Sequence, residues 1–440
     1  MTSFEARTMS GLATDDKLEV DKLEAVAVQA PSPFDDLPDE VLLEILHSAL
    51  VKVPDPSQAV TPQMISLNKR LYRLAREVWL SSAEFNGDWK LLARSELFPA
   101  VKSLDFLMSN EHPNAQIYEG VFVGQFTNLR SLTINTALPE TEEFPESLTD
   151  SLRKLKHLHT LTFSCSSPWT LADKTFNIAG DLPTLRTLSI RDASPALGQL
   201  LTPSPALDHL GFTPGDDFEA YNFIPWSSLA SLTVYHERYI PSAALFRGIG
   251  NSLTKALFPE TIKRAPAKLP LRRFVHDHFK NGPVYDLVEL EGLLEALRLT
   301  SVRQAVLNLD LALSGFSSLP SLPSLTSLKL EGRSRSIDTP DNLANLYRFL
   351  HTFPALQHLE ILDTWLHRFM DAPNATEAPQ DPASPEFIFA HPLVATLLAV
   401  LRQSTVLSLK WSEPRERGAY YQWTRTTTDE DFQADRYQRV

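Results

Sequence analysis

A short apolar pattern that recurs along most of the chain constrains its fold more than any other feature. The pattern is an apolar residue, two variable residues, an apolar residue, one variable residue and a third apolar residue. The first six occurrences start 22 to 29 residues apart, and the later ones start 23 to 50 residues apart. Repetition at such a period indicates stacked structural units. The eleven occurrences are Val101-Leu104-Phe106, Leu129-Leu132-Ile134, Leu158-Leu161-Phe163, Leu185-Leu188-Ile190, Leu207-Leu210-Phe212, Leu229-Leu232-Val234, Leu271-Phe274-His276, Val302-Ala305-Leu307, Leu325-Leu328-Leu330, Leu356-Leu359-Ile361 and Val406-Leu409-Trp411.

Each occurrence predicts a short strand. Residues two positions apart point to the same side of a strand, so the second and third apolar residues face a core and the residue between them faces outward. A single occurrence would fit any amphipathic segment, but eleven in order favour a repeat. A shared lead-in supports this, and it predicts a turn into the strand: Phe126-Thr-Asn-Leu129, Leu182-Pro-Thr-Leu185, Leu322-Pro-Ser-Leu325 and Phe353-Pro-Ala-Leu356.

Segments between the predicted strands have helical spacing of their apolar residues. Asp286 and Asp341 are start signals for two of these helices. A full unit is therefore expected to run strand, turn, helix, turn. The predicted helices cover residues 144–155, 284–299, 339–353 and 392–401, with a further helical insert around 241–257.

This pattern resembles leucine-rich repeats over about residues 97–412. The resemblance implies an α/β solenoid shaped as a horseshoe, with parallel strands on its concave face and helices on its convex face. The asparagine of the tighter repeat signature is mostly absent, so we expect an irregular solenoid. We place it at residues 83–412, with inserts at 235–270 and 363–390. The tail, residues 413–440, contains Tyr420, Tyr421 and Trp423, which are expected to pack against the last repeat.

Residues 34–82 have a different pattern, that of short amphipathic helices. Pro38 suits a first helical turn, where its missing N–H group is not needed. Val41, Leu42, Ile45 and Leu46 then form one apolar stripe at helical spacing. The preceding residues 1–33 are polar and lack a sustained period, which predicts a disordered arm.

The helical segment resembles an F-box, in particular the divergent kind found in large fungal families. The resemblance is carried by Leu37-Pro38-x-Glu40-Val41-Leu42-x-x-Ile45-Leu46, followed by Ile65-Ser-Leu67-Asn-Lys-Arg-Leu-Tyr72-x-Leu-Ala75. It implies a module that binds the Skp-type adaptor of an SCF (Skp–cullin–F-box) ubiquitin ligase. The alternative is a helical hairpin that only caps the repeats. By position, the adaptor contact would be made by Leu37, Pro38, Val41, Leu42, Ile45 and Leu46.

Composition limits the partners. A net charge of −13 and a pI of about 5.4 argue against a general phosphate-binding surface. Cys165 is the single cysteine, which excludes an internal disulfide and any cysteine-based zinc site, and it suits the reducing cytosol or nucleus. The N-terminal residues 1–34 contain no apolar core of signal-peptide length, and no apolar run elsewhere approaches the length of a membrane helix.

The sequence contains no G-x-S-x-G, no H-E-x-x-H and no P-loop motif. Gly248-Ile-Gly250 lacks the third glycine of a dinucleotide site and does not follow an apolar strand. His276-Asp-His278 places two imidazoles at strand spacing without further metal ligands, so we expect His276 to be a core or edge residue. Cys165 follows a predicted strand with no base indicated, so we expect a small buried side chain. No cofactor is expected.

The remaining candidates are the outward positions of the predicted strands. In the first half they are small and hydroxylic: Ser131, Thr133, Thr160, Thr162, Ser164, Thr187 and Ser189. In the second half they are larger or charged and can hold a target protein through hot-spot and charge-paired contacts. The alternative is a solvated face without a ligand. These candidate target-binding residues are Tyr235, Arg273, Asp277, Lys329, Glu331, His358, Glu360 and Lys410.

Together these patterns predict a non-catalytic substrate receptor of an SCF ubiquitin ligase. The helical module would bind the adaptor and, through it, the cullin ligase, while the repeats would hold the target protein. Two alternatives stay open: a repeat scaffold or inhibitor without a ligase role, and an enzyme whose site has no recognisable sequence motif.

Overall fold

The computed structural model divides the chain into two compact units, residues 1–80 and 81–440. The residues that the structure describes are 37–42, 74, 82–85, 98–108, 121–136, 142–165, 169–191, 196–213, 218–236, 242–259, 266–278, 287–313, 320–331, 339–362, 392–412, 420–426 and 431–438. The predicted N-terminal arm and the predicted insert at 363–390 lie outside these ranges.

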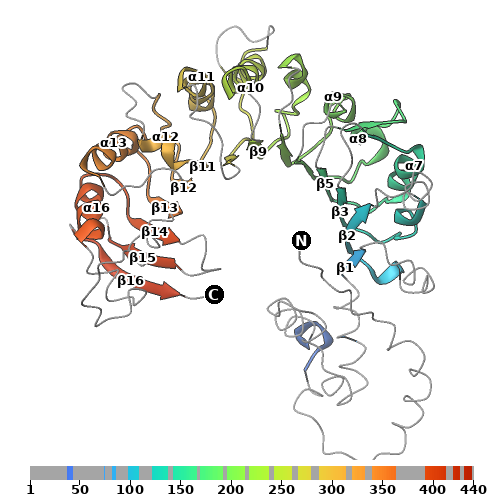
Figure 1. Ribbon diagram of the computed structural model, residues 1–440, viewed down its shortest axis with the longest axis horizontal. Coiled ribbons are helices and arrows are strands. Elements are labelled where there is room, and N and C mark those ends of the chain that lie inside the picture. Colours follow the sequence, from blue (N-terminus) through green and yellow to red (C-terminus); the bar gives the residue numbers. More distant parts are fainter. Residues whose placement is uncertain are drawn as a thin grey trace, which may run out of the picture. The chain divides into compact units, whose positions relative to one another are not determined.

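The second unit is a mixed α/β structure built on one long, mainly parallel sheet (Figure 1). All eleven predicted strands are present, and each pairs with its neighbours in chain order. In the described residues the order of the sheet is β1 (Ser82–Phe85), β2 (Ser103–Met108), β3 (Ser131–Thr136), β5 (Thr160–Cys165), β7 (Thr187–Ile190), β8 (His209–Phe212), β9 (Ser231–His236), β10 (Arg273–His278), β11 (Gln304–Asn308), β12 (Ser327–Glu331), β13 (His358–Leu362), β14 (Ser408–Ser412), β15 (Tyr420–Thr424) and β16 (Gln433–Gln438).

The helices of this unit lie on one side of the sheet, so the strands line the inner side of the curved stack (Figure 1). Helix α7 begins at Glu146, later than predicted, because Phe144 belongs to a short strand and Pro145 separates the two. A small second sheet pairs β4 (Glu142–Phe144) with β6 (Trp169–Leu171). The helices are α7 (Glu146–Lys154), α8 (Ile178–Asp181), α9 (Leu197–Leu200), η3 (Phe218–Phe223), α10 (Ser242–Leu257), α11 (Leu287–Arg298), α12 (Leu309–Leu313), α13 (Pro340–His351) and α16 (Pro392–Arg402).

One buried residue per strand forms a continuous apolar column through the sheet. The strand register pairs each of these residues with its counterpart on the next strand, and each is at most 4% exposed. Burial alternates along β5, β12 and β13, so the residues between the apolar positions are left on the inner face there. In β7 and β8 the position between them, Ser189 and Gly211, is buried as well. The column, from β2 to β14, is Leu104, Leu132, Leu161, Leu188, Leu210, Leu232, Phe274, Ala305, Leu328, Leu359 and Leu409.

The shared lead-in is a hydrogen-bonded turn, as predicted. The amide of Leu185 donates to the carbonyl of Leu182 at 3.0 Å, and that of Leu356 donates to Phe353 at 3.1 Å. This bond closes a four-residue turn, in which proline is favoured at the second position because its φ is already correct. Pro183 and Pro354 occupy that position, which explains why the phrase repeats.

The C-terminal tail covers the end of the parallel sheet. Tyr421 and Trp423 are buried, as expected, but they belong to an antiparallel pair of strands, β15 and β16, that the repeat pattern did not predict. The Arg425 guanidinium donates to the carbonyls of Val406 (2.8 Å) and Arg402 (3.0 Å), and to that of Leu401 (3.3 Å). It thus binds the carbonyls at the end of α16, which lack partners within the helix.

We predict that Arg425→Lys loosens this end of the sheet. A lysine ammonium concentrates its donors at one point and cannot bridge carbonyls on both α16 and the chain before β14. Hydrogen bonds of charged groups contribute about 1.5–3 kcal/mol, so amide exchange in β15 should accelerate at least about tenfold. Arg402→Lys is the control. Among the described residues, the Arg402 side chain forms only an exposed ion pair with Asp431, at 2.8 Å, and such pairs contribute little to stability. Equal exchange rates in β15 for the two variants would contradict the role of Arg425.

Candidate functional site

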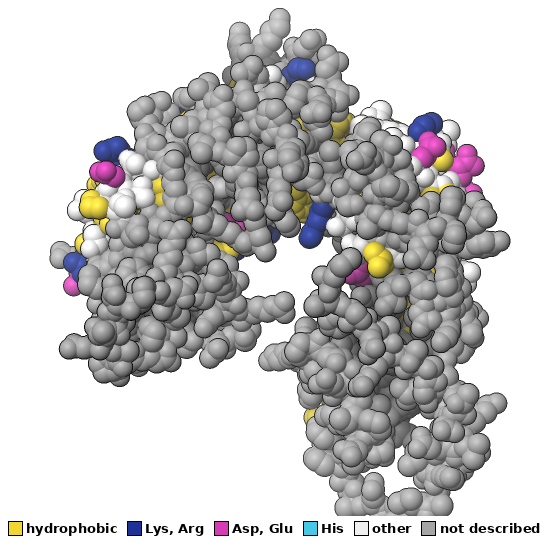
Figure 2. Space-filling view, in the orientation of Figure 1, with side chains coloured by type: hydrophobic (Ala, Val, Ile, Leu, Met, Phe, Trp, Pro, Cys, Tyr) yellow, Lys and Arg dark blue, Asp and Glu magenta, His cyan; other side chains and the backbone are white. Residues whose placement is uncertain are grey.

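The inner face of the sheet is the surface that the repeats leave uncovered by helices (Figure 1). Its first half carries small hydroxylic side chains, as predicted, and Thr133 and Thr162 are half-buried there. Figure 2 shows a Lys or Arg side chain exposed on this inner side near the middle of the stack. The larger groups of the inner face gather in two places, one over β7–β10 and one over β12–β14.

We call the group over β7–β10 the central patch. It is organised by Tyr235, whose side chain starts on β9, crosses β8 and reaches β7. There its hydroxyl lies 2.9 Å from the Ser189 Oγ. The crossing needs space over β8, and Gly211 provides it, because a Cβ at this position would lie 2.8 Å from the Tyr235 hydroxyl oxygen. The members of the patch are Ser189, Arg191, His209, Gly211, Tyr235 and Arg273.

Two arginines give the central patch its charge. The Arg191 guanidinium lies 5.7 Å from the centre of the Tyr235 ring, a cation–π distance. Arg273 on β10 is in register with Ser231 and, one strand further, with His209. Burial, together with the nearby Arg273 charge, lowers the pKa of His209 below its ordinary value of 6.5. The ring is therefore held mainly neutral at pH 7, and the patch can bind a carboxylate or a planar group through its arginines and tyrosine.

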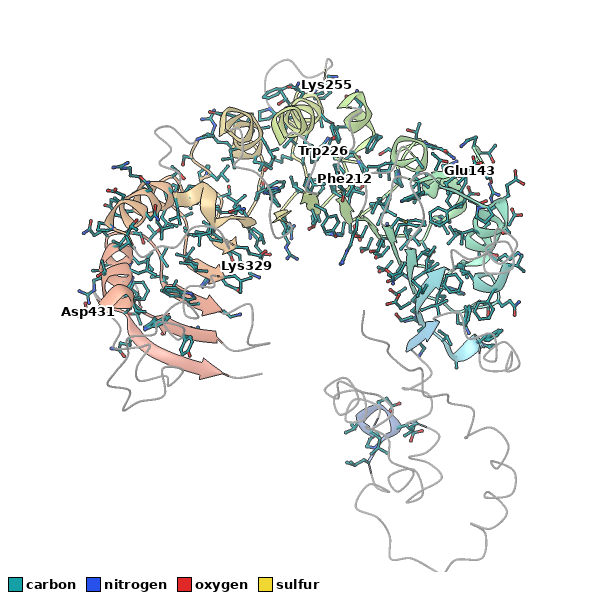
Figure 3. The ribbon with its side chains drawn as sticks, viewed as in Figure 1. Glu143, Phe212, Trp226, Lys255, Lys329 and Asp431 are labelled. Atoms are coloured by element: carbon teal, nitrogen blue, oxygen red, sulfur yellow. The ribbon has the colours of Figure 1, made fainter. Side chains whose placement is uncertain are left out.

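The group over β12–β14 is a charge ladder of alternating sign. The Lys329 Nζ lies 2.7 Å from the Glu331 carboxylate and 3.7 Å from that of Glu360, and the Lys410 Nζ also lies 3.7 Å from Glu360. Lys329, Glu360 and Lys410 are register partners on neighbouring strands. Burial acts to lower the pKa of Lys329, but the bonds and charges of the two glutamates outweigh it and raise the pKa. Figure 3 shows Lys329 on the inner side of the stack and Lys255 of α10 on the outer side. Since the two lysines are matched by two glutamates, this ladder is charge-balanced.

The structure places six of the eight predicted target-binding residues in these two groups. Tyr235 and Arg273 belong to the central patch, while Lys329, Glu331, Glu360 and Lys410 make up the charge ladder. His358 is exposed on β13, in register with Ser327 and Ser408. Asp277 lies in β10 opposite Tyr235, and its side chain is outside the described residues.

Sequence reasoning missed Arg191, His209 and Gly211. Arg191 follows the last residue of β7, and its amide continues the ladder by donating to the carbonyl of Phe163 at 2.9 Å. A search two positions beyond Ser189 for a large charged residue would have found it. Gly211 could have been found only by asking which side chain of the neighbouring strand, here Tyr235 of β9, needs the space above it.

The residues weighed for chemistry are packing residues where the structure describes them. Cys165 and His276 are both buried, as predicted, and His276 occupies the position of a repeat apolar residue. In the described part of the chain, no three His, Cys, Asp or Glu side chains gather as metal ligands would. Nor does any helix there have the length and apolarity needed to cross a membrane.

The described part of the first unit contains the start of the predicted adaptor-binding helix. The amide of Leu42 donates to the Pro38 carbonyl at 3.1 Å, and residues 39–42 are helical. Pro38 is exposed and Val41 is 40% exposed, but Leu42 is only 1% exposed. The Leu42 side chain is therefore covered by the chain itself. Leu37 is half-buried, and Ile45 and Leu46 lie outside the described residues.

Comparison with known proteins gives limited similarity. No protein-family model and no curated protein matches the chain. A solved structure that resembles it is the leucine-rich repeat-containing protein LegL7 from Legionella pneumophila, with a TM-score of 0.37 and 13% sequence identity. That match covers 73% of this chain and 97% of LegL7.

We predict that Gly211→Ala displaces Tyr235 from Ser189. The added methyl group would overlap the tyrosine ring, and no left-handed backbone is required at Gly211, so the substitution tests space alone. The loss of one hydrogen bond implies a destabilisation of about 1 kcal/mol. A double-mutant cycle of chemical unfolding with Tyr235→Ala measures it, because Gly211→Ala should cost little once the ring is gone. An equal cost in both backgrounds would contradict the proposed crossing.

Proposed function

We propose that this chain is a non-catalytic protein-interaction scaffold whose inner face binds a partner protein. The observation that supports this best is the central patch on the inner face, which none of the described helices covers. An exposed arginine, Arg191, over the ring of Tyr235 is a typical composition for an interface hot spot. The curved stack presents such groups from several strands to one partner.

More specifically, we propose that the chain is the substrate receptor of an SCF-type ubiquitin ligase. This proposal is supported by the F-box-like sequence and by the exposed Pro38 and Val41 at the start of its helix. The first unit would bind the Skp-type adaptor, and through it the cullin, while the second unit would hold the target. Catalysis would then be a matter of proximity, since the ligase brings the ubiquitin-transfer machinery to a bound target. This role would place the chain in the cytosol or nucleus.

The alternative is a scaffold or inhibitor without a ligase role. In that case the helical unit only stabilises the chain and binds no adaptor. The two functions differ in one property, which is adaptor binding by the first unit. An enzyme would instead require convergent ionisable groups in a cavity.

We predict that Val41→Asp abolishes co-purification of the Skp-type adaptor with the full chain. A carboxylate buried against an apolar partner surface costs several kcal/mol, whereas Val41 is already 40% exposed in the free chain, so folding should be unaffected. Leu42→Asp is unsuitable because Leu42 is buried. Val121→Asp is the matched control, since Val121 is 46% exposed in the second unit.

Loss of the adaptor with Val41→Asp and its retention with Val121→Asp would support the ligase role. Absence of the adaptor from the unmodified chain, or its retention by Val41→Asp, would favour the scaffold without a ligase role.

A further inference from the structure

A row of basic residues lies at the edge of the sheet where the strands begin. Each of these residues comes directly before the first outward residue of its strand. Backbone hydrogen bonds align them: the amide of Arg130 donates to the Lys102 carbonyl at 2.7 Å, that of His159 to Arg130 at 2.8 Å, and that of Arg186 to His159 at 2.9 Å. We call this row, which comprises Lys102, Arg130, His159, Arg186, Arg272 and Arg303, the basic edge.

The same hydrogen-bond ladder shows where the basic edge is interrupted. Asp208 before β8 and Ala230 before β9 separate Arg186 from Arg272. Neighbouring strands lie about 4.8 Å apart, so the first four positions extend over about 14 Å. All six residues of the basic edge are exposed. Among the described residues, no carboxylate forms an ion pair with Arg130, Arg272 or Arg303.

The basic edge contrasts with the charge of the whole chain, which is −13. At physiological ionic strength the field of a charge is screened beyond about 8 Å, so the edge acts as a local cationic surface. Arg273 follows Arg272 directly and belongs to the central patch. The basic edge and the central patch thus adjoin in the chain at the start of β10.

We propose that the partner held by the inner face carries an extended acidic segment that binds along the basic edge. The inference deepens the proposed interaction function and rests on it. An extended polypeptide places every second side chain on one side, about 6.7 Å apart. Long, flexible Lys and Arg side chains at strand spacing can pair with carboxylates at that interval.

An acidic protein segment fits this surface better than a nucleic acid. Nucleic-acid-binding domains are usually basic overall, whereas this chain has a pI of about 5.4. Single-strand binding surfaces also interleave cations with aromatic stacking platforms. The edge positions before β2 to β11 are Lys, Arg, His, Asp and Ala, without Phe, Tyr or Trp.

The test uses the full chain and a fluorescent peptide of about twelve residues with glutamate at alternate positions. Fluorescence anisotropy should show binding that weakens with added salt, and a glutamine version of the peptide should bind poorly. Arg130→Glu with Arg186→Glu should weaken binding at least about tenfold. Asp208→Asn should tighten binding, because it removes the one acidic group that interrupts the row.

The control pair is Lys174→Glu with Lys255→Glu, which makes the same change in charge at exposed residues away from the strand-start edge. Arg130→Gln with Arg186→Gln replaces the glutamate pair if thermal unfolding shows that the latter misfolds, and it should also weaken binding. Equal loss with the control pair, or no binding of the acidic peptide, would overturn the proposal. Tighter, edge-dependent binding of a single-stranded RNA of equal length would also overturn it.

This outcome is independent of the adaptor test. A chain that keeps its adaptor but does not bind the acidic peptide contradicts the basic edge alone. A chain that binds the peptide but has no adaptor contradicts the ligase role alone.

Discussion

The structure depends on the alignment of one buried apolar side chain per strand. Because the parallel ladder holds neighbouring strands in register, Leu188 lies on Leu161 and beneath Leu210, and each covers the apolar surface of the next. A single unit could not bury this residue, so each unit is stable only through its neighbours. The ends of the column then need another cover. At the C-terminal end it is provided by the hairpin β15–β16, in which Trp423 is the register partner of Leu409.

This alignment also determines where function can lie. The inward positions are apolar in all units except one, and in that unit the inward His276 is buried as well. The outward positions and the residues just before each strand have no such requirement, so their side chains can differ from one unit to the next. The small residues of the first half, the central patch, the charge ladder and the basic edge are therefore local features on a uniform framework. Their side chains are brought close together only because the ladder puts equivalent positions about 4.8 Å apart.

Most of the framework could be predicted from the sequence, because it depends on local spacing. The apolar pattern located all eleven repeat strands, and the Leu182-Pro183 and Phe353-Pro354 lead-ins gave the turns before two of them. The arrangement of the site was less accessible. The position of Tyr235 depends on the missing Cβ of Gly211 and on Ser189, which is 46 residues away along the chain. Lys329 and Glu360 were correctly placed on one face, but their pairing into a balanced ladder required the register of β12 and β13.

The basic edge could not be predicted from the repeat pattern either. Arg130, Arg186 and Arg272 lie between the lead-in leucine and the first outward strand residue, a position that belongs neither to the core nor to the expected binding face. Their alignment follows from backbone hydrogen bonds such as that from the Arg186 amide to the His159 carbonyl. In an acidic chain, such a row discriminates between two kinds of anion. Long polyanions meet the negative charge of the remaining surface, whereas a short acidic segment stays within about one Debye length of the cations and is attracted by them. The same charge distribution that argues against a general phosphate-binding surface thus favours a protein partner of defined local charge.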